Sequence, residues 1–555
     1  MSGLSHNRAP TLSGAALGWW RPEGALASSR EASIKDRLLR LREPFFVVDM
    51  DGKPSAVSGG SALLGGAAPE PGSLPLLAYV PACPPEALGD LSFCRDHGLR
   101  YPYLCGAMAN GIASVEVVEA AARAGALGFF GAAGLSLERV EAAIDRLQGS
   151  LAGLPYGFNL IHSPNEPDLE AEVVGLYLRK GVRLVEASAY LDLTLPVVRY
   201  RVSGLRRGPD GSVLAPNRVI AKVSRVEVAA KFFSPPPDSI LRELLESKQI
   251  TPEEASLAAS IPVAQDVTGE ADSGGHTDNR PLVTILPSLL ALRDSLQARH
   301  GYAEPLRVGA AGGISTPASV AAAFAMGAAY VLTGSVNQAC VESGTCDAVR
   351  AMLAQAAQAD TAMAPAADMF EMGVKVQVLK RGTMFAMRAA KLYEAYKSCA
   401  GISDIPADRK AALERELFRA PLEDIWRQTR EFFLKRDPSQ VERAERDPKH
   451  QMALVFRWYL GLASRWANAG EPGRHLDYQV WCGPAMGAFN EWARGSFLEA
   501  PAQRTVPTVA LNLLFGASYL IRVRGLGRQG VPVDPEAQRF SPMTLSSIQP
   551  LLEVP

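Results

Sequence analysis

The sequence predicts an α/β protein: a (β/α)8 TIM barrel with an added, mostly helical subdomain after the eighth strand. Eight short apolar or β-rich runs alternate with helical patterns between residues 101 and 333, as such a barrel requires. Glycine-rich ends follow the last two runs, which favours the barrel over the alternative, a doubly wound open sheet. The eight runs are 101–105, 126–131, 155–161, 183–188, 218–224, 261–267, 306–310 and 329–333.

Helical patterns fill most of the intervals between these runs. Examples are Val115 to Ala124, Leu137 to Leu147, Leu169 to Arg179 and Pro317 to Met326. Two short helices, Ile240 to Ser247 and Pro252 to Ala259, are expected to interrupt the alternation between the fifth and sixth runs. Thr251 caps the second of these helices, and Pro252 takes its first helical position.

The remaining chain divides into segments of different character. Residues 1–35 predict a loosely ordered leader, and residues 36–95 predict short strands separated by turns. The barrel is expected over 96–345, with a C-terminal return at about 471–530. Residues 346–470 are amphipathic and too long for a barrel loop, so they predict a helical subdomain.

The composition indicates a soluble globular protein, because 47% of the residues are hydrophobic and 21% are charged. A net charge of -1 argues against a general nucleic-acid binder. Seven scattered cysteines without a CxxC pair, and the lack of a secretory signal pattern, predict a cytoplasmic protein with free thiols. The apolar stretch Val506 to Ile521 is shorter than a membrane span and predicts a buried core element.

The candidate active site is expected at the carboxyl ends of the strands, where barrel enzymes place their chemistry. The loop Glu270 to Pro281, after the sixth run, presents Gly274 and Gly275 followed directly by His276. Histidine titrates near neutral pH, which suits a group that transfers protons. The alternative interpretation of this loop is a surface turn rich in Gly, Asp and Asn.

Other strand ends carry groups suited to a phosphate-bearing flavin. Glycine-rich ends on strands seven and eight are typical phosphate sites, and a lysine at the end of strand five suits the electron-rich edge of a reduced flavin. Each position alone has a structural alternative, such as a turn or an ion pair. The candidate flavin-binding residues are Ala107, Met108, Ala109, Asn110, Asn159, Glu186, Lys222, Gly274, Gly275, Gly312, Gly313, Gly334 and Ser335, and no metal ligand set is predicted.

The Gly274-Gly275-His276 loop and the glycine-rich ends at 312–313 and 334–335 resemble the FMN-binding nitronate monooxygenase (2-nitropropane dioxygenase) superfamily. That superfamily includes the FabK-type enoyl-acyl carrier protein reductases. The resemblance implies that His276 is the catalytic acid/base. It also implies an acidic residue near the flavin shortly before the histidine, and both Glu270 and Asp272 compete for that place.

A more specific resemblance is to the PfaD-type enoyl reductases of polyunsaturated fatty acid synthases and trans-acyltransferase polyketide synthases. It covers roughly residues 40–525 and includes a region after the eighth strand that simple nitronate monooxygenases lack. The stretches that carry it are Glu270 to Pro281, Ala367 to Gln377, Lys380 to Phe385, Lys391 to Glu394 and Trp481 to Asn490.

The PfaD-type resemblance implies a trans-acting reductase of a 2-enoyl thioester on an acyl carrier protein, with FMN and NADPH as cofactors. His276 would then supply the proton for the α-carbon. Two alternatives stay open: a nitronate monooxygenase, and a catalytically silent flavin-binding component of a synthase. A homodimer is a further hypothesis.

Basic residues beside the family-specific stretch are candidates for docking the acidic carrier protein. The alternative is a solvated basic face or internal ion pairs. The candidates are Lys375, Lys380, Arg381, Arg388 and Lys391.

Overall fold

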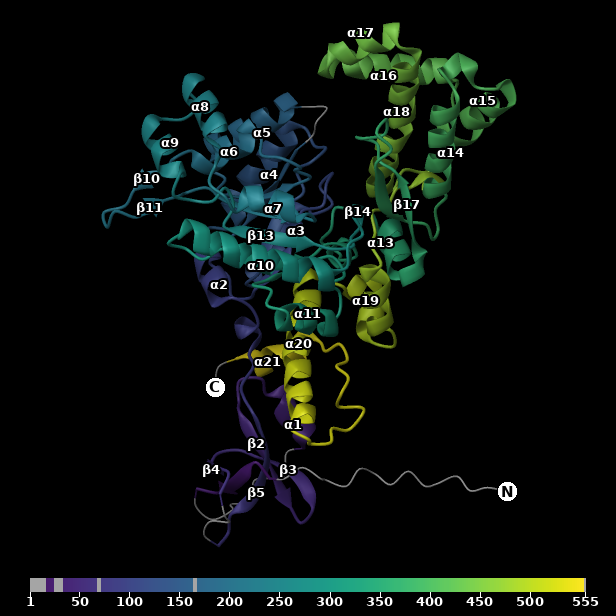
Figure 1. The fold of residues 1–555 in the computed structure, drawn as a ribbon. Helices are drawn as coiled ribbons and strands as arrows, with labels where there is room; N and C mark the ends of the chain where they lie inside the picture. Colours follow the sequence, from purple (N-terminus) through teal and green to yellow (C-terminus); the bar gives the residue numbers. More distant parts are fainter. Residues whose placement is uncertain (1–15, 24–32, 67–70, 163–166, 554–555) are drawn as a thin grey trace, which may run out of the picture. The chain divides into compact units, whose positions relative to one another are not determined.

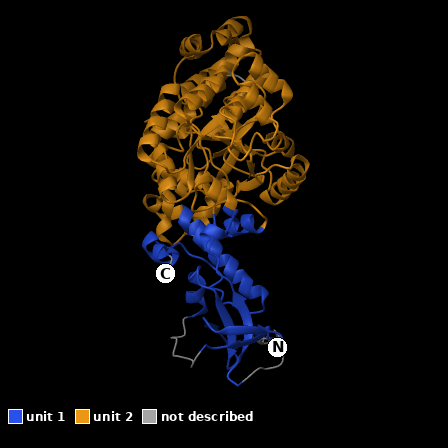
Figure 2. Ribbon diagram, turned by 90° about the vertical axis from the view of Figure 1, so that its left-hand side faces the viewer, with its two compact units in different colours: residues 1–91, 316–325, 510–555 blue, residues 92–315, 326–509 orange. Residues whose placement is uncertain are grey.

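The computed structural model describes residues 16–23, 33–66, 71–162 and 167–553 (Figure 1). These residues form two compact units, each described separately (Figure 2). The first unit is 1–91, 316–325 and 510–555, and the second is 92–315 and 326–509. The units therefore divide the chain at other points than the predicted segments. Most of the predicted leader, 1–35, lies outside the described residues.

The second unit is built on a closed, parallel, eight-stranded barrel, which confirms the predicted fold class. Its strands follow one another around the barrel in sequence order, and the last pairs with the first. The strands are β6 (Tyr103–Cys105), β7 (Leu127–Phe130), β8 (Gly157–Ile161), β9 (Leu184–Ser188), β12 (Arg218–Val223), β13 (Asp266–Glu270), β15 (Arg307–Ala311) and β16 (Val331–Thr333).

The sixth barrel strand lies later in the sequence than the run 261–267 predicts. The amides of Val263 and Ala264 donate to the carbonyls of Ser234 and Phe232, which follow the fifth barrel strand, so these residues do not enter the sheet. Pairing with both neighbouring strands begins at Asp266 and continues through residues of low hydrophobicity. As a result, Glu270 is the last residue of the strand rather than part of the loop after it.

Helices cover the intervals between the strands, and two of them match the expected short interruption before β13. Thr251 and Glu254 form the predicted N-terminal cap as a reciprocal capping box. The second unit begins within α2 (Leu91–His97) and has a two-stranded ribbon of β10 (Arg206–Arg207) and β11 (Val213–Leu214). The barrel helices of this unit are α3 (Val115–Arg123), α4 (Leu137–Ser150), α5 (Pro167–Lys180), α6 (Leu195–Val202), α7 (Val226–Phe232), α8 (Asp238–Glu246), α9 (Pro252–Ala258), α10 (Leu282–His300) and α12 (Ser335–Gln338).

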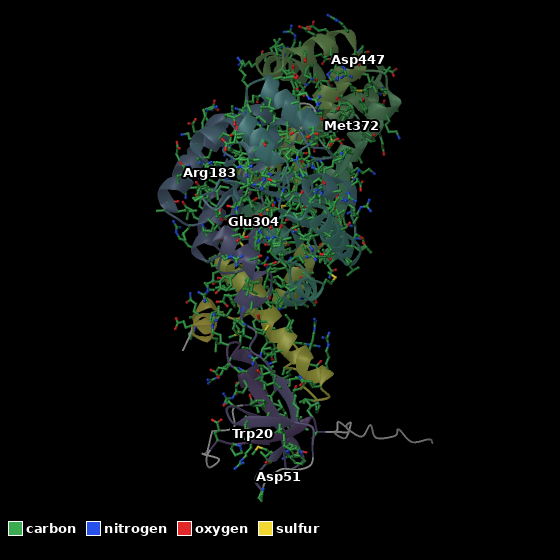
Figure 3. All side chains as sticks on the ribbon, turned by 60° about the vertical axis from the view of Figure 1, so that its left-hand side comes forward. Trp20, Asp51, Arg183, Glu304, Met372 and Asp447 are labelled. Atoms are coloured by element: carbon green, nitrogen blue, oxygen red, sulfur yellow. The ribbon has the colours of Figure 1, made fainter. Side chains whose placement is uncertain are left out.

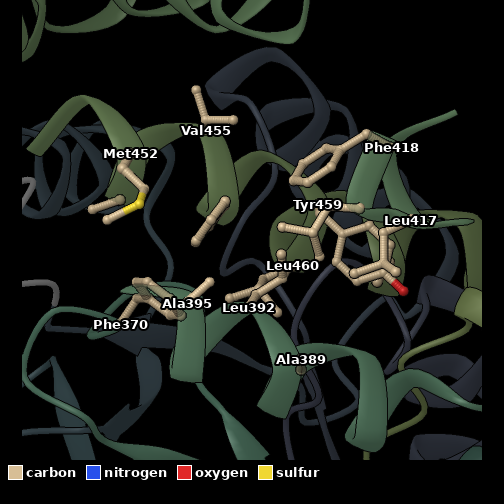
Figure 4. Packing of buried hydrophobic residues seen from close by; sticks show 14 of the residues in the cluster. Phe370, Ala389, Leu392, Ala395, Leu417, Phe418, Met452, Val455, Tyr459 and Leu460 are labelled. Carbon is tan, nitrogen blue, oxygen red and sulfur yellow. The ribbon is translucent and has the colours of Figure 1, made fainter. Parts of the chain in front are cut away.

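The region after the barrel is mostly helical but also contains a β-hairpin. The hairpin strands β17 (Thr361–Pro365) and β18 (Lys375–Leu379) form a sheet with β14 (Gly275–His276). Beside them, side chains such as Phe370, Leu392 and Tyr459 pack into one apolar cluster (Figure 4). The helices are α13 (Asp347–Ala354), α14 (Phe385–Ser398), α15 (Ala407–Leu413) with a π-turn at Glu414–Phe418, α16 (Leu422–Arg436), α17 (Pro438–Arg446), α18 (Pro448–Ala469) and α19 (Ala485–Ala493).

The first unit pairs a five-stranded antiparallel sheet with a few helices. Arg522 is buried and donates to the carbonyls of Leu38, Arg40 and Glu43, which fixes the long helix α20 to the N-terminal chain. The strands are β1 (Gly18–Arg21), β2 (Phe45–Met50), β3 (Lys53–Val57), β4 (Ser61–Leu64) and β5 (Leu74–Val80). The helices are α1 (Ile34–Leu39), α11 (Pro317–Ala325), α21 (Leu545–Leu552) and, from residue 510 on, α20 (Val506–Arg528).

Helix α20 (Val506–Arg528) is longer than the apolar stretch Val506 to Ile521 from which it was predicted. It has 23 residues, and among the described residues it is the one helix long and apolar enough to cross a membrane. However, 89% of its most apolar window is buried inside the protein. The buried core helix of a soluble protein has the same length and composition, so these properties are weak evidence for a membrane span.

Candidate active site

Three charged side chains meet at the carboxyl end of the barrel. Lys222 Nζ on β12 lies 3.2 Å from Glu270 Oε1 at the end of β13. On β9, Glu186 is fully buried, and its Oε2 accepts a hydrogen bond of 3.0 Å from the amide of Ala107. The side chains of Lys222, Glu270 and Glu186 and the backbone amide of Ala107 thus form one polar group. Each of the four comes from a different strand or strand end.

Burial raises the pKa of Glu186 to about 6, although Lys222 and the Ala107 amide oppose the rise. Burial also lowers the pKa of Lys222, but the negative charges of Glu270 and Glu186 outweigh it and hold that pKa above its usual value. Glu186 Oε1 is buried and has no hydrogen-bond partner among the described residues. A buried carboxylate oxygen without a partner is costly, which indicates that a donor from a bound molecule belongs there.

His276 lies on β14, which pairs antiparallel with β18 of the post-barrel hairpin. Its Nε2 is 3.2 Å from Asp368 Oδ1, and its side chain is 38% exposed. Partial burial lowers the pKa of His276, but the hydrogen bond and charge of Asp368 outweigh that effect and raise the pKa. Glu270 raises this pKa further and Lys222 lowers it, so the histidine and the lysine group act on each other electrostatically.

Glu270 and Asp272, the two candidates for the acidic residue near the flavin, have different surroundings. Glu270 faces Lys222, whereas Asp272 Oδ1 accepts hydrogen bonds of 2.8 Å from both Gln377 and Asn279. Gln377 also donates to the carbonyl of Ser273 at 2.7 Å. Asp272 therefore anchors the loop before His276 to β18, and Glu270 belongs to the charged group in the barrel.

The glycines of the site serve two different purposes. A Cβ on Gly274 would lie 2.8 Å from the backbone of Cys482, and one on Gly312 would lie 2.5 Å from that of Ala271, so both allow close backbone packing. In contrast, no atom lies within 4 Å of a Cβ placed on Gly313 or Gly334. The first pair holds the histidine loop in place, and the second pair leaves open space beside the ends of strands seven and eight.

Two further predicted positions fix the site's framework. Gly275 has a φ of 82°, a conformation that glycine adopts readily, directly before His276. Ser335 Oγ accepts a hydrogen bond of 3.3 Å from the amide of Gly483, which joins the end of strand eight to the segment that packs on Gly274.

Four other predicted residues are committed to local structure. The Met108 carbonyl accepts from Ala113, and that of Ala109 accepts from Ile112. Asn110 Nδ2 donates 2.7 Å to Ser464 on α18, which ties the first barrel loop to the post-barrel helices. The side-chain amide of Asn159 donates through Nδ2 to the backbone carbonyl of Glu186 on the neighbouring strand. Their side chains or carbonyls thus stabilise the loops and strands that carry the charged group.

The residues present fit FMN. The unpartnered oxygen of Glu186 can accept a hydrogen bond from a polar flavin edge, and Lys222 supplies positive charge beside it. The open space at Gly313 and Gly334 would admit a phosphate close to the backbone. Among the described residues, no group of three or more His, Cys, Asp or Glu side chains is placed to hold a metal ion.

The candidate docking residues do not share one environment. Lys375, Lys380 and Lys391 are exposed, and Arg381 is 53% exposed although it pairs with Asp360. Met372, an apolar residue on the loop between β17 and β18, is 64% exposed (Figure 3).

Arg388 is a correction to the predicted docking set. Its guanidinium pairs with the fully buried carboxylate of Asp477, which also accepts from Arg474 and Tyr459. Arg388 is therefore committed to an internal network, which was the alternative interpretation of these basic residues.

Sequence reasoning missed the roles of Asp368, Gln377 and the Cys482-Gly483 segment. All three lie within stretches that carry the family resemblance, which was the available signal. No spacing rule connects them to the barrel, because the contact between His276 and Asp368 spans 92 positions in the sequence.

Two family profiles match parts of the chain. The profile of the nitronate monooxygenase family matches residues 95–416, which is more than half of the chain. The chain belongs to the nitronate monooxygenase family. A second profile, the inserted helical domain of acyl-carrier-protein S-malonyltransferase, matches residues 399–478 of this family member.

Two curated relatives come from synthase systems. A polyunsaturated fatty acid synthase protein of Thraustochytrium sp. is 50% identical over 454 residues, which are 80% of this chain and 30% of the relative. Polyketide biosynthesis protein PksE of Bacillus subtilis is 46% identical over 440 residues, which are 79% of this chain and 57% of the relative. This nitronate monooxygenase family member thus spans 30% and 57% of the length of these two relatives.

A solved structure narrows the relationship within the family. The enoyl reductase domain of MlnA, from the macrolactin biosynthesis cluster of Bacillus amyloliquefaciens, is 41% identical and has a TM-score of 0.76. The match covers 80% of this chain and 99% of that domain. The predicted relationship to the PfaD-type enoyl reductases is confirmed.

Proposed function

We propose that this protein is a trans-acting, FMN-dependent reductase of 2-enoyl thioesters carried on an acyl carrier protein, with NADPH as reductant. The observation that carries the proposal is the placement of His276 and Asp368 next to the Glu186, Lys222 and Glu270 group at the barrel's carboxyl end. The 41% identity to an enoyl reductase domain supports the proposed reduction of an enoyl group.

FMN bound at this site would supply hydride transfer from NADPH to the β-carbon of the enoyl thioester. Glu186 and Lys222 would hold and orient it through the free carboxylate oxygen and the positive charge beside it. Glu270 keeps Lys222 protonated, because its negative charge raises the lysine pKa. Gly312, kept against Ala271, would bring the phosphate loop into place.

His276 holds the proton that the α-carbon needs after hydride transfer. Asp368 accepts from His276 Nε2 and raises the pKa of the imidazole, so the ring stays protonated to a higher pH. The other ring nitrogen remains available to face the substrate. Asp368 is thus a positioning residue for His276, and the hairpin of β17 and β18 brings it there.

The decisive experiment follows the flavin without oxygen. The purified protein is reduced with NADPH, and the crotonyl thioester of a phosphopantetheinylated acyl carrier protein is then added. We expect the oxidised flavin absorbance to return together with the formation of the butyryl thioester. A protein that binds no flavin would refute the proposal, and so would a reduced flavin that ignores the thioester. Oxidation of a nitroalkane by such a protein would instead favour the nitronate monooxygenase alternative.

We also propose that the exposed basic residues Lys375, Lys380, Arg381 and Lys391 contribute to carrier-protein docking. Carrier proteins are acidic, and rim charges act mainly on the association rate and its salt dependence. The K380E/R381E double variant should raise the KM for crotonyl-carrier protein by about 30-fold, since each reversed charge costs roughly 1 kcal/mol at an exposed site. The KM for crotonyl-pantetheine, which has no protein part, is the control. An unchanged KM for the carrier-protein substrate would remove this segment from the docking surface.

A further inference from the structure

A cavity of about 790 Å³ lies in the barrel-containing unit, against the loops that follow the barrel strands β6 and β7. The loop after β6 contributes Asn110 and Gly111 to its lining, and the start of α3, helix α4 and the C-terminal part of α18 contribute most of the rest. The loop that contributes Asn110 is the same one whose Ala107 amide binds Glu186. One loop therefore contributes residues to both the cavity and the candidate flavin site.

The charges that line the cavity are unbalanced. Arg139 and Arg146 on α4 and Arg465 on α18 face one carboxylate, that of Glu116. Arg146 is neutralised, because it pairs with Glu116 at 2.6 Å and with Glu119 at 3.3 Å. Within the described part of the chain, Arg139 and Arg465 have no ion pair or hydrogen bond and are exposed. Two arginines from different helices thus line the same cavity without an ion-pair partner among the described residues.

A third donor in the lining lacks a partner. Asn468 Nδ2 is buried and makes no hydrogen bond among the described residues, whereas its Oδ1 accepts from Thr345 at 3.4 Å. Asn468 lines the cavity, and the N–H donors of its side chain are the groups that lack a partner there. Phe130 and Leu135 add apolar lining. The cavity therefore combines an anion-binding part with an apolar wall.

We infer that this cavity binds the phosphate group of a substrate as it enters the active site. Paired arginines with an amide donor are suited to phosphate, because guanidinium groups form charge-assisted, bidentate bonds to phosphate oxygens. The inference rests on the proposed function, under which two substrates carry phosphate: the phosphopantetheine arm of the carrier protein and NADPH. Both sources share this chemistry, and the experiment distinguishes them.

The test measures binding without turnover. The Kd of the FMN-loaded protein is measured by calorimetry for crotonyl-phosphopantetheine and crotonyl-pantetheine, and for NADP⁺ and NAD⁺. The R139A/R465A variant should weaken one of the two phosphorylated ligands by about 10- to 100-fold, as expected for losing two charge-assisted contacts. Its counterpart without the phosphate should bind as in the wild type. The ligand that is weakened identifies the source of the phosphate.

Arg242→Ala on α8 is the matched control, because Arg242 is also exposed but does not line the cavity. It should change no Kd. The R139K/R465K variant should recover part of the lost affinity, since it keeps the charge. The inference fails if neither phosphorylated ligand is weakened selectively, or if Arg242→Ala causes an equal loss. A wild-type protein that binds these ligands through the arginines but reduces no thioester would refute the proposed function alone.

Discussion

Replacing His276 by alanine should slow the reduction of crotonyl-carrier protein by about 10²- to 10⁴-fold, the usual contribution of a general acid. FMN binding should persist, because the groups that fit the flavin lie on other strand ends: Glu186, Lys222, Gly313 and Gly334. Single-turnover measurements separate the two steps. Flavin reduction by NADPH should be unchanged, and only the reaction of the reduced protein with the thioester should be slow. Equal rates for both proteins would show that the proton comes from elsewhere.

The Asp368→Asn variant is a control that acts on the same histidine without removing it. A general acid must be protonated, so the rate should fall as the pH rises through the pKa of His276. Asp368 raises that pKa, and its loss should therefore move this fall to lower pH. Enoyl reductase rates measured across the pH range would reveal the shift. An identical pH profile would mean that Asp368 has no effect on the acid.

Removal of Arg307 should destabilise the barrel by about 3–5 kcal/mol, because it leaves the buried carboxylate of Asp266 without its guanidinium partner. Arg307 Nε lies 2.6 Å from Asp266 Oδ1, and Arg307 Nη1 lies 2.8 Å from Asp96 Oδ2. His97 Nε2 contacts the second oxygen of Asp266 at 2.8 Å, and all but Asp96 are buried. Urea unfolding of Arg307→Met, read as the midpoint of the barrel transition, measures the effect.

The D266N/R307M double variant separates the buried charge from the lost packing. Without the carboxylate, most of the penalty should disappear, because no uncompensated ion remains in the barrel. A single variant as stable as the wild type would contradict the role assigned to this network. A double variant as unstable as the single one would attribute the loss to packing instead.

The periodic parts of the fold were predictable, and the pairings between distant segments were not. Eight apolar runs separated by helical patterns predicted the barrel, because strand and helix periods are local properties of the sequence. The one displaced strand, β13, contains Thr268 and Gly269 and lacks an apolar signal, so its position depends on pairing with its neighbours. The hairpin of β17 and β18 was missed in a region of helical composition, since it is stabilised by pairing with β14.

The sequence by itself determined the barrel, the presence of His276 at a strand end and the family to which the chain belongs. Only the tertiary structure shows that Glu270 and Asp272 have different surroundings, because these depend on which neighbour reaches each carboxylate: Lys222 or Gln377. It likewise assigned Asp368 to His276. The contacts that Asp272 and His276 make span 105 and 92 positions in the sequence, and they follow from how the elements pack rather than from any local pattern.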